Sequence, residues 1–208
     1  MTDLPDSRLY LVLPQVFEPA GMATRLADVF SHVAIACVRI DLGAADEHSW
    51  TQAVNHAIGP CHDAEVALVV TDHFRLVEPL GLDGVHLSAA ARTPVREVRK
   101  ELGPDRIVGA SAGASQHQGL VLAEAGADYV SLGPVGDAGA LGDAERAGDE
   151  LFQWWAEMIE TPCVAEGGVT VEHAQRLSPW TDFVVPDPAI WDAPDAPEKL
   201  KAFEAALR

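Results

Sequence analysis

Several features are scarce in this chain of 208 residues, and each scarcity excludes a class of protein. No apolar run approaches the roughly 20 residues that a membrane span needs, and residues 1–8 hold no basic segment leading into an apolar one. The 3 cysteines, Cys37, Cys61 and Cys163, are odd in number and lack Cys-x-x-Cys spacing, so neither a disulfide framework nor a zinc site is indicated. We expect a cytoplasmic protein with no membrane partner and with buried cysteines.

Positive charge is also scarce. Lysine and arginine together number 14 against 32 acidic residues, which gives a formal net charge of −18. Contacts to nucleic-acid phosphates need clustered basic side chains, so no nucleic-acid partner is expected, and the charge is typical of a soluble acidic surface. With 48% hydrophobic residues, and with 17 glycines and 14 prolines scattered along the chain, residues 1–208 are predicted to fold as one domain.

Eight short apolar runs recur along the chain, about 25 residues apart, with helix-like segments between them. The runs are rich in Val, Ile and Leu without clean polar alternation, as expected of parallel strands that are buried on both faces. They span residues 9–13, 33–40, 66–70, 84–87, 107–111, 129–133, 163–165 and 183–185.

Helical candidates lie between these runs, at residues 22–30, 50–58, 93–102, 115–125, 144–160, 171–177 and 198–207, with a shorter one around 74–80. Eightfold alternation of strand and helix favours a closed barrel over an open doubly wound sheet. The open alternative is also disfavoured because no Gly-x-Gly-x-x-Gly follows the first strand. The sequence therefore predicts an α/β protein, a single-domain (β/α)8 TIM barrel.

Several of the predicted strands end in Gly, Ser, His or Pro, which is where such barrels carry their functional groups. The motifs are Asp-Gly-Val-His-Leu-Ser at 83–88, Gly-Ala-Ser at 109–111, Gly-Ala-Asp-Tyr-Val-Ser-Leu-Gly-Pro at 126–134 and Glu-Gly-Gly-Val at 166–169. In this order they resemble the thiamine phosphate synthase and thiazole tautomerase superfamily. The resemblance implies a Mg²⁺-dependent enzyme of thiamine biosynthesis that joins a pyrimidine diphosphate to a thiazole phosphate and releases diphosphate.

The resemblance also implies roles for individual residues. Arg39 would contact the diphosphate and Asp72 would hold Mg²⁺. The paired glycines Gly167 and Gly168 would offer backbone N–H groups to the phosphate of the second substrate. Other residues of the predicted site for a small phosphorylated thiamine precursor are Ser111, Gly133 and Asp187.

The chain departs from the family pattern at several of these positions. Cys37 and Asp41 stand where the family has glutamine and lysine, and Ala91 stands where it has a second metal-binding aspartate. Residues 135–143 contain no Thr, Lys or Arg, although the family grips diphosphate there. Gly113 replaces the histidine of the tautomerase branch. These departures leave open a ligand-binding or regulatory relative without synthase activity.

A further alternative is an enzyme with shifted chemistry at an acidic barrel mouth, by which we mean the end of the barrel where the strands finish. Asp41, Asp72, Glu166 and Asp187 fall there. Clustered anions would raise the pKa of Glu166 and make it a general base, with His86 as its acid partner. The simpler interpretation is that the aspartates are solvated or cap helices and that His86 is a core histidine.

A long loop and the tryptophans near the last strands allow both structural and functional interpretations, which have equal merit for the loop alone. The Gly- and Ala-rich stretch 133–143 is either a lid or a plain surface connection. Trp191 is placed to close over the site, whereas Trp154 and Trp155 are expected to pack outside the sheet or against a second copy of the chain, so a homo-oligomer is compatible with the sequence.

Overall fold

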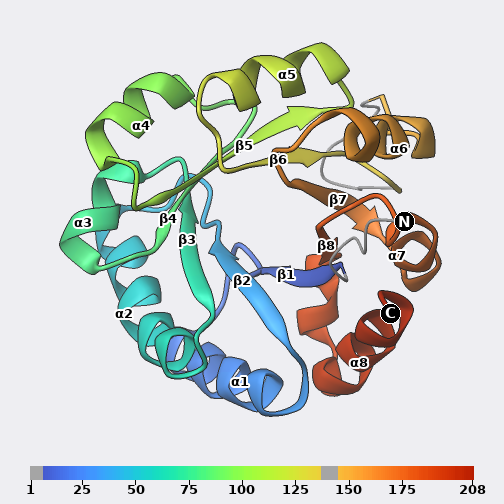
Figure 1. Ribbon diagram of the computed structural model, residues 1–208. Coiled ribbons are helices and arrows are strands. Elements are labelled where there is room, and N and C mark those ends of the chain that lie inside the picture. Colours follow the sequence, from blue (N-terminus) through green and yellow to red (C-terminus); the bar gives the residue numbers. More distant parts are fainter. Residues whose placement is uncertain (1–6, 137–144) are drawn as a thin grey trace.

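The computed structural model describes residues 7–136 and 145–208. Eight parallel strands form a closed barrel in the order β1-β2-β3-β4-β5-β6-β7-β8, and the helices surround it (Figure 1). The last strand pairs with the first through Arg8 opposite Phe183 and Leu9 opposite Val184. The predicted (β/α)8 barrel is confirmed.

The strands are β1 (Arg8–Val12), β2 (Ile35–Ile40), β3 (Ala67–Thr71), β4 (Gly84–Leu87), β5 (Ile107–Gly113), β6 (Tyr129–Leu132), β7 (Cys163–Val169) and β8 (Phe183–Pro186). The helices are α1 (Pro19–His32), α2 (Glu47–Asp63), α3 (Val77–Leu80), α4 (Val95–Leu102), α5 (Gln116–Glu124), α6 (Asp149–Met158), α7 (Val171–Leu177) and α8 (Ala196–Ala206). Two 3₁₀ turns, η1 (Phe74–Leu76) and η2 (Pro188–Asp192), follow β3 and β8.

Three boundaries differ most from the expected ones. Helix α2 runs on to Asp63 and not to residue 58, and the other two differences concern β7 and α6. Strand β7 runs on to Val169, because its pairing with β8 resumes there after a break. The register shifts between Ala165 and Val169, so residues 166–168 form an irregularity within the strand. Helix α6 begins at Asp149, after Gly148 at its N-cap, and not near residue 144. The expected lid, 133–143, lies mostly outside the described residues.

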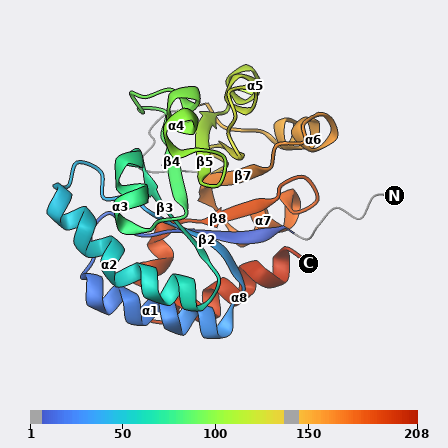
Figure 2. The ribbon, with the colours of Figure 1, turned by 60° about the vertical axis from the view of Figure 1, so that its left-hand side comes forward.

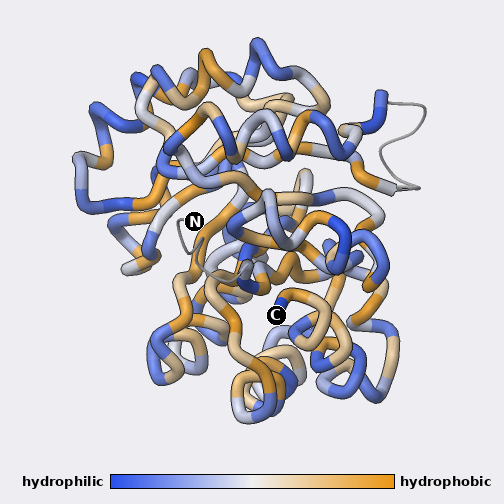
Figure 3. The backbone as a smooth tube through the Cα atoms, turned by 45° about the vertical axis from the view of Figure 1, so that its right-hand side comes forward, coloured by the Kyte–Doolittle hydropathy of each residue, from blue (hydrophilic) through white to orange (hydrophobic). Residues whose placement is uncertain are grey.

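Two apolar layers hold the barrel together. The larger one lies between the strands and the surrounding helices, where Trp50, Phe152 and Trp155 are among the largest fully buried side chains. Figure 2 shows α1, α2 and α8 along one side of the barrel and α4, α5 and α6 along the other. In Figure 3 the apolar stretches follow the strands, and hydrophilic residues interrupt the helices.

The smaller layer fills the barrel itself. Tyr10 and Tyr129 meet edge to face across its interior, with ring centroids 5.7 Å apart. Gly109 makes room for this pair, since a Cβ atom there would lie 1.9 Å from Cζ of Tyr129. The barrel is therefore plugged by aromatic rings and is not a channel. The other residues of this layer are Val12, Cys37, Val69, Val164 and Val185.

Three aspartates stabilise the end of the barrel where the strands begin, which lies opposite the mouth. Asp83, Asp128 and Asp182 each immediately precede an even-numbered strand. Each carboxylate accepts a hydrogen bond from the backbone N–H of the first or second residue of the strand before it. The backbone N–H of each aspartate donates in return to that strand. The motif aspartates at 83 and 128 thus have a structural role at the strand starts.

Helix α8 packs against α1 and α7 and closes the ring of helices (Figure 1). The three cysteines are free and buried, as expected. Within residues 7–136 and 145–208, no helix is long and apolar enough to cross a membrane.

Candidate active site at the barrel mouth

An ion pair lies at the centre of the barrel mouth. Arg39 on β2 donates from Nη2 to Oε2 of Glu166 on β7 at 2.8 Å, and both side chains are largely buried. Ser131 on β6 donates its hydroxyl to the other carboxylate oxygen, Oε1, at 2.7 Å. Each of the three residues lies two positions after a residue whose side chain fills the barrel interior. Because side chains alternate between the two faces of a strand, these three side chains also point toward the barrel axis.

The pair fixes the charge of both groups. Burial raises the pKa of Glu166, but the Arg39 guanidinium, His86 and the two hydrogen bonds outweigh it and lower this pKa to about 2. Burial disfavours the charged form of Arg39, yet the Glu166 carboxylate raises the pKa of Arg39 above its usual value. The expectation of a raised pKa at Glu166 is therefore wrong, because a cation and not other anions adjoins it.

A buried chain of hydrogen bonds runs beneath the ion pair. Nδ1 of His86 lies 3.0 Å from the hydroxyl of Tyr129, which lies 2.8 Å from the hydroxyl of Tyr10. Burial and the positive charge of Arg39 lower the pKa of His86 to about 3. His86 is thus a neutral core histidine at physiological pH, which contradicts a proton relay titrating near neutrality and agrees with the simpler interpretation.

Hydrogen-bond donors without a partner remain on the neighbouring strands β2 and β3. Among the described residues, Nε and Nη1 of Arg39 and the hydroxyl of Thr71 are buried without a hydrogen-bond partner. Each such group costs about 1–3 kcal/mol unless something satisfies it. The mouth therefore offers buried hydrogen-bond donors to a ligand with acceptor atoms.

Asp72, the predicted metal ligand, adopts a left-handed backbone with φ of 59° just after β3. Its Oδ1 accepts from the backbone N–H of Ser88 at 2.7 Å, and its Oδ2 accepts from the Ser88 hydroxyl at 2.6 Å. Within the described ranges, no group of three or more His, Cys, Asp or Glu residues is placed to hold a metal. The described residues alone do not fit Mg²⁺, since a single carboxylate cannot fill its octahedral coordination shell without water or substrate oxygens.

A glycine-rich turn borders the ion pair on the β6 and β7 side. Gly167 and Gly168 have φ values of 85° and 67°, in the region that only glycine adopts freely. A Cβ atom on Gly133 would lie 2.2 Å from the carbonyl oxygen of Glu166, and one on Gly136 would lie 2.1 Å from that of Gly168. The glycines thus allow two strand-end loops to touch.

A cavity of about 350 Å³ opens beside this turn. It is lined by Gly136, Arg146, Gly168, Val169, Thr170, His173 and Asp187. It combines one guanidinium with the backbone of a glycine turn, which is chemistry suited to an anionic group.

The remaining predicted residues do not gather into an acidic mouth. Asp41 accepts from the backbone N–H of Gly43, and Asp187 caps η2 by accepting from Ala189, so both stabilise their own turns. Ser111 is half-buried on β5, opposite Ser131 in the register. Trp191 does not close over the site, because its buried indole N–H donates to the carbonyl of Val12 at 3.0 Å.

Sequence reasoning missed Ser131, Thr71 and the tyrosine pair as members of this mouth and its floor. A signal existed for two of them. Ser131 lies two residues after Tyr129 on one predicted strand, so both side chains face the same side. Nothing in the sequence alone showed that this side faces Glu166.

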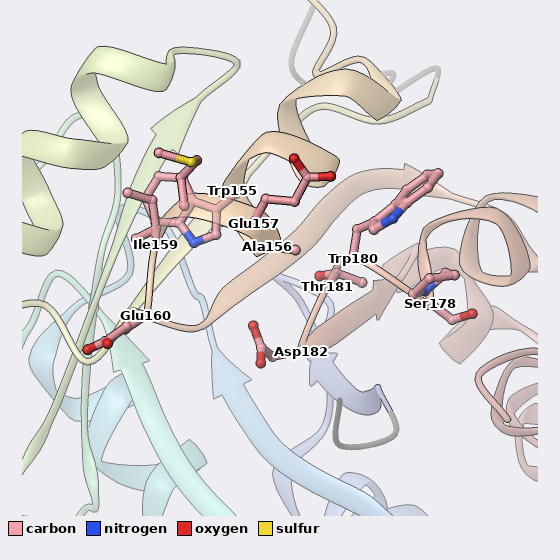
Figure 4. Close-up of a pocket in the computed structure, with 11 residues that line it drawn as sticks. Trp155, Ala156, Glu157, Ile159, Glu160, Ser178, Trp180, Thr181 and Asp182 are labelled. Carbon is pink, nitrogen blue, oxygen red and sulfur yellow. The ribbon is translucent and has the colours of Figure 1, made fainter. Parts of the chain in front are cut away.

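A second cavity, of about 470 Å³, lies at the opposite end of the barrel. It is formed by the C-terminal end of α6 and the loop before β8, and Figure 4 shows Trp155 and Trp180 on either side of the Asp182 carboxylate. This carboxylate already accepts from the backbone of Cys163 at 2.8 Å. This cavity is therefore lined in part by Asp182, which already stabilises the start of β7.

The fold and the mouth define a small (β/α)8 barrel of the class that binds its ligand at the carboxyl ends of the strands. The family described as thiamine monophosphate synthase matches residues 9–180. A thiamine-phosphate synthase of Rhodospirillum centenum is 36% identical over 99% of this chain and 100% of its own length. One of Erythrobacter litoralis is 32% identical over 97% of this chain and 95% of its own. The chain therefore belongs to the thiamine monophosphate synthase family.

A solved structure supports the same fold. The chain is similar to the thiamine phosphate pyrophosphorylase from Pyrococcus furiosus, with a TM-score of 0.83 and 20% identity, over 96% of this chain and 95% of that one. The suspected resemblance to thiamine phosphate synthase is thus confirmed at the level of family and fold.

Proposed function

We propose that this chain is a thiamine-phosphate synthase, which joins a hydroxymethylpyrimidine diphosphate to a thiazole phosphate and releases inorganic diphosphate. The observation that carries the proposal is the match to curated relatives of that name along almost the whole of both chains. The mouth supports it with two separate regions for anionic groups, the Arg39 guanidinium and the cavity beside Gly168.

The two regions suggest a division of roles. Arg39 would meet the diphosphate of the first substrate. The backbone of Gly133, Gly167 and Gly168 would hold the phosphate of the second substrate. Asp187 lines the cavity at this second position, and Ser111 would bond whichever ligand rests on β5.

His86 would act from the floor of the site. Since its pKa is about 3, the imidazole is neutral and serves as a hydrogen-bonding group held by Tyr129. Glu166, with a pKa of about 2, would remain a carboxylate throughout and would hold Arg39 in place. Neither group is suited to proton transfer near neutral pH.

Magnesium would have to arrive with the substrate. Mg²⁺ is commonly held by one or two protein carboxylates together with substrate phosphates and water. Asp72 is the carboxylate that the mouth offers for this purpose, and it is oriented by Ser88.

A second candidate function is binding of a thiamine precursor without turnover. It is favoured first by the observation that Arg39 is already engaged by Glu166. The absence of Thr, Lys and Arg from residues 135–143 points the same way.

The test is a mass-spectrometric assay for thiamine phosphate after incubation of the protein with Mg²⁺ and both phosphorylated substrates. Arg39→Ala is a poor control, because it leaves a buried unpaired carboxylate, which costs about 3–5 kcal/mol. The double variant Arg39→Met/Glu166→Leu removes the pair as a unit and should stay folded by circular dichroism. Product from the wild type and none from the double variant supports a synthase; ligand binding without product supports the second candidate.

A further inference from the structure

Glu166 occupies the position on Arg39 that a ligand anion would take. Its carboxylate accepts the Nη2 donor at 2.8 Å, and it is anchored from the other side by the Ser131 hydroxyl at 2.7 Å. Arg39 is only 9% exposed, so a ligand has little access to its guanidinium while this contact persists. The two remaining nitrogens, Nε and Nη1, are buried and have no partner among the described residues.

We propose that Glu166 is an internal counter-anion, which competes with the ligand's phosphate groups for Arg39 and thereby sets how tightly the mouth holds diphosphate. The proposal rests on the proposed synthase function, in which diphosphate is the leaving product. Without Glu166, the Arg39 guanidinium would bind the multiply charged diphosphate tightly and release it slowly. With Glu166 as its counter-anion, Arg39 binds diphosphate less tightly and releases it more readily. Glu166 is on this view a specificity and product-release residue, and not a general base.

Among residues 7–136 and 145–208, no second anion that accepts a hydrogen bond from Arg39 adjoins the pair. The groups that face it from the neighbouring strands are the neutral His86 on β4, the Ser131 hydroxyl on β6 and the phenol rings of Tyr10 and Tyr129. The Arg39 guanidinium lies 5.7 Å from the centroid of the Tyr10 ring, a contact that favours a cation in this position. Removing the charge of Glu166 therefore leaves the charge of Arg39 without a counter-anion among the described residues that adjoin it, and so strengthens its attraction for anions.

Glu166→Gln makes this change with little loss of shape. The amide oxygen can accept from Arg39, and the amide nitrogen can donate to the Ser131 oxygen, which is also an acceptor. Asp41→Asn is the matched control, because it removes one negative charge two residues beyond Arg39 on the same segment. Asn can still accept the Gly43 N–H bond that Asp41 accepts at 3.0 Å.

The experiment is a calorimetric titration of each protein with inorganic diphosphate in EDTA. Two unit charges about 4 Å apart near a protein surface interact strongly enough to change affinity up to about a thousandfold, and salt reduces this. We expect the dissociation constant of Glu166→Gln to fall about tenfold or more, with that of Asp41→Asn within about twofold of the wild type. Equal tightening in both variants, or none in Glu166→Gln, overturns the proposal.

A measurement on the wild type covers the case in which Glu166→Gln does not fold. The Nε–H group of Arg39 is buried, and its ¹⁵N NMR signal can be assigned by its loss in Arg39→Met/Glu166→Leu. We expect inorganic diphosphate to shift this signal, and an unmoved signal at saturating diphosphate overturns the proposal. This outcome is separate from that of the synthase assay. If the wild type forms thiamine phosphate but Glu166→Gln binds diphosphate no more tightly, the counter-anion role alone is refuted. If Glu166→Gln binds diphosphate more tightly but the wild type forms no thiamine phosphate, the synthase function alone is refuted.

Discussion

The buried His86 should make the stability of this protein fall steeply in mild acid. In the unfolded chain His86 protonates near pH 6.5, whereas in the folded protein its pKa is about 3, because burial and Arg39 disfavour the imidazolium. Between these values the unfolded state binds one more proton than the folded state. The free energy of unfolding therefore decreases by about 1.4 kcal/mol for each pH unit below 6.5.

The perturbation that isolates this effect is His86→Asn, whose amide lies near the position of Nδ1 and can still bond the Tyr129 hydroxyl. The variant has a lower absolute stability because it leaves space in the barrel, but it lacks the titrating group. Between pH 6.5 and 4.5 the wild type should lose about 3 kcal/mol more than the variant. Below pH 4.5 protonation of Glu166, whose folded pKa is about 2, adds a further loss in both proteins.

The assay is urea unfolding at several pH values, followed by circular dichroism, with the slope of free energy on pH compared between the two proteins. The comparison of slopes cancels the other histidines, which titrate in both. Parallel curves for the wild type and His86→Asn would show that His86 is protonated in the folded state and would refute the assignment of a neutral core histidine.

Three further outcomes follow from contacts elsewhere in the barrel. Gly109→Ala should destabilise the protein by about 3 kcal/mol in urea unfolding, since its Cβ would lie 1.9 Å from Tyr129 Cζ; a cost below about 1 kcal/mol would contradict the plugged barrel. Asp182→Ala should cost about 2 kcal/mol, because it unpairs the backbone N–H of Cys163, and an unchanged thermal midpoint would argue against that role. Calorimetry with MgCl2 alone should show no binding, while Mg²⁺ with diphosphate should; heat from the metal alone would reveal a site that the described residues do not form.

The fold was predictable because its signal is repeated. Eight Val- and Ile-rich runs and the helices between them specify the barrel several times over, so an error of a few residues at one boundary does not change the architecture. The extension of β7 to Val169 was not predictable, because Gly167 and Gly168 read as a turn and only the neighbouring strands show that pairing resumes after them.

The site was predictable in position but not in chemistry. Strand ends located Arg39, His86 and Glu166 at the mouth, and the structure places them together. The sign of the pKa change at Glu166 depended on its neighbour across the barrel, and sequence separation gives no hint that residue 166 meets residue 39. Asp41 and Asp187 looked like members of a cluster because they follow strands, yet each is satisfied within its own turn.

The tyrosine pair beneath the ion pair has a consequence for how a ligand reaches the mouth. Tyr10 and Tyr129 fill the interior of the barrel, so a ligand reaches the ion pair from the mouth and not through the barrel. A ligand at the Arg39–Glu166 pair would therefore enter and leave by the same end of the barrel. The packing of two aromatic rings thus makes a shared route for entry and exit a property of the scaffold itself.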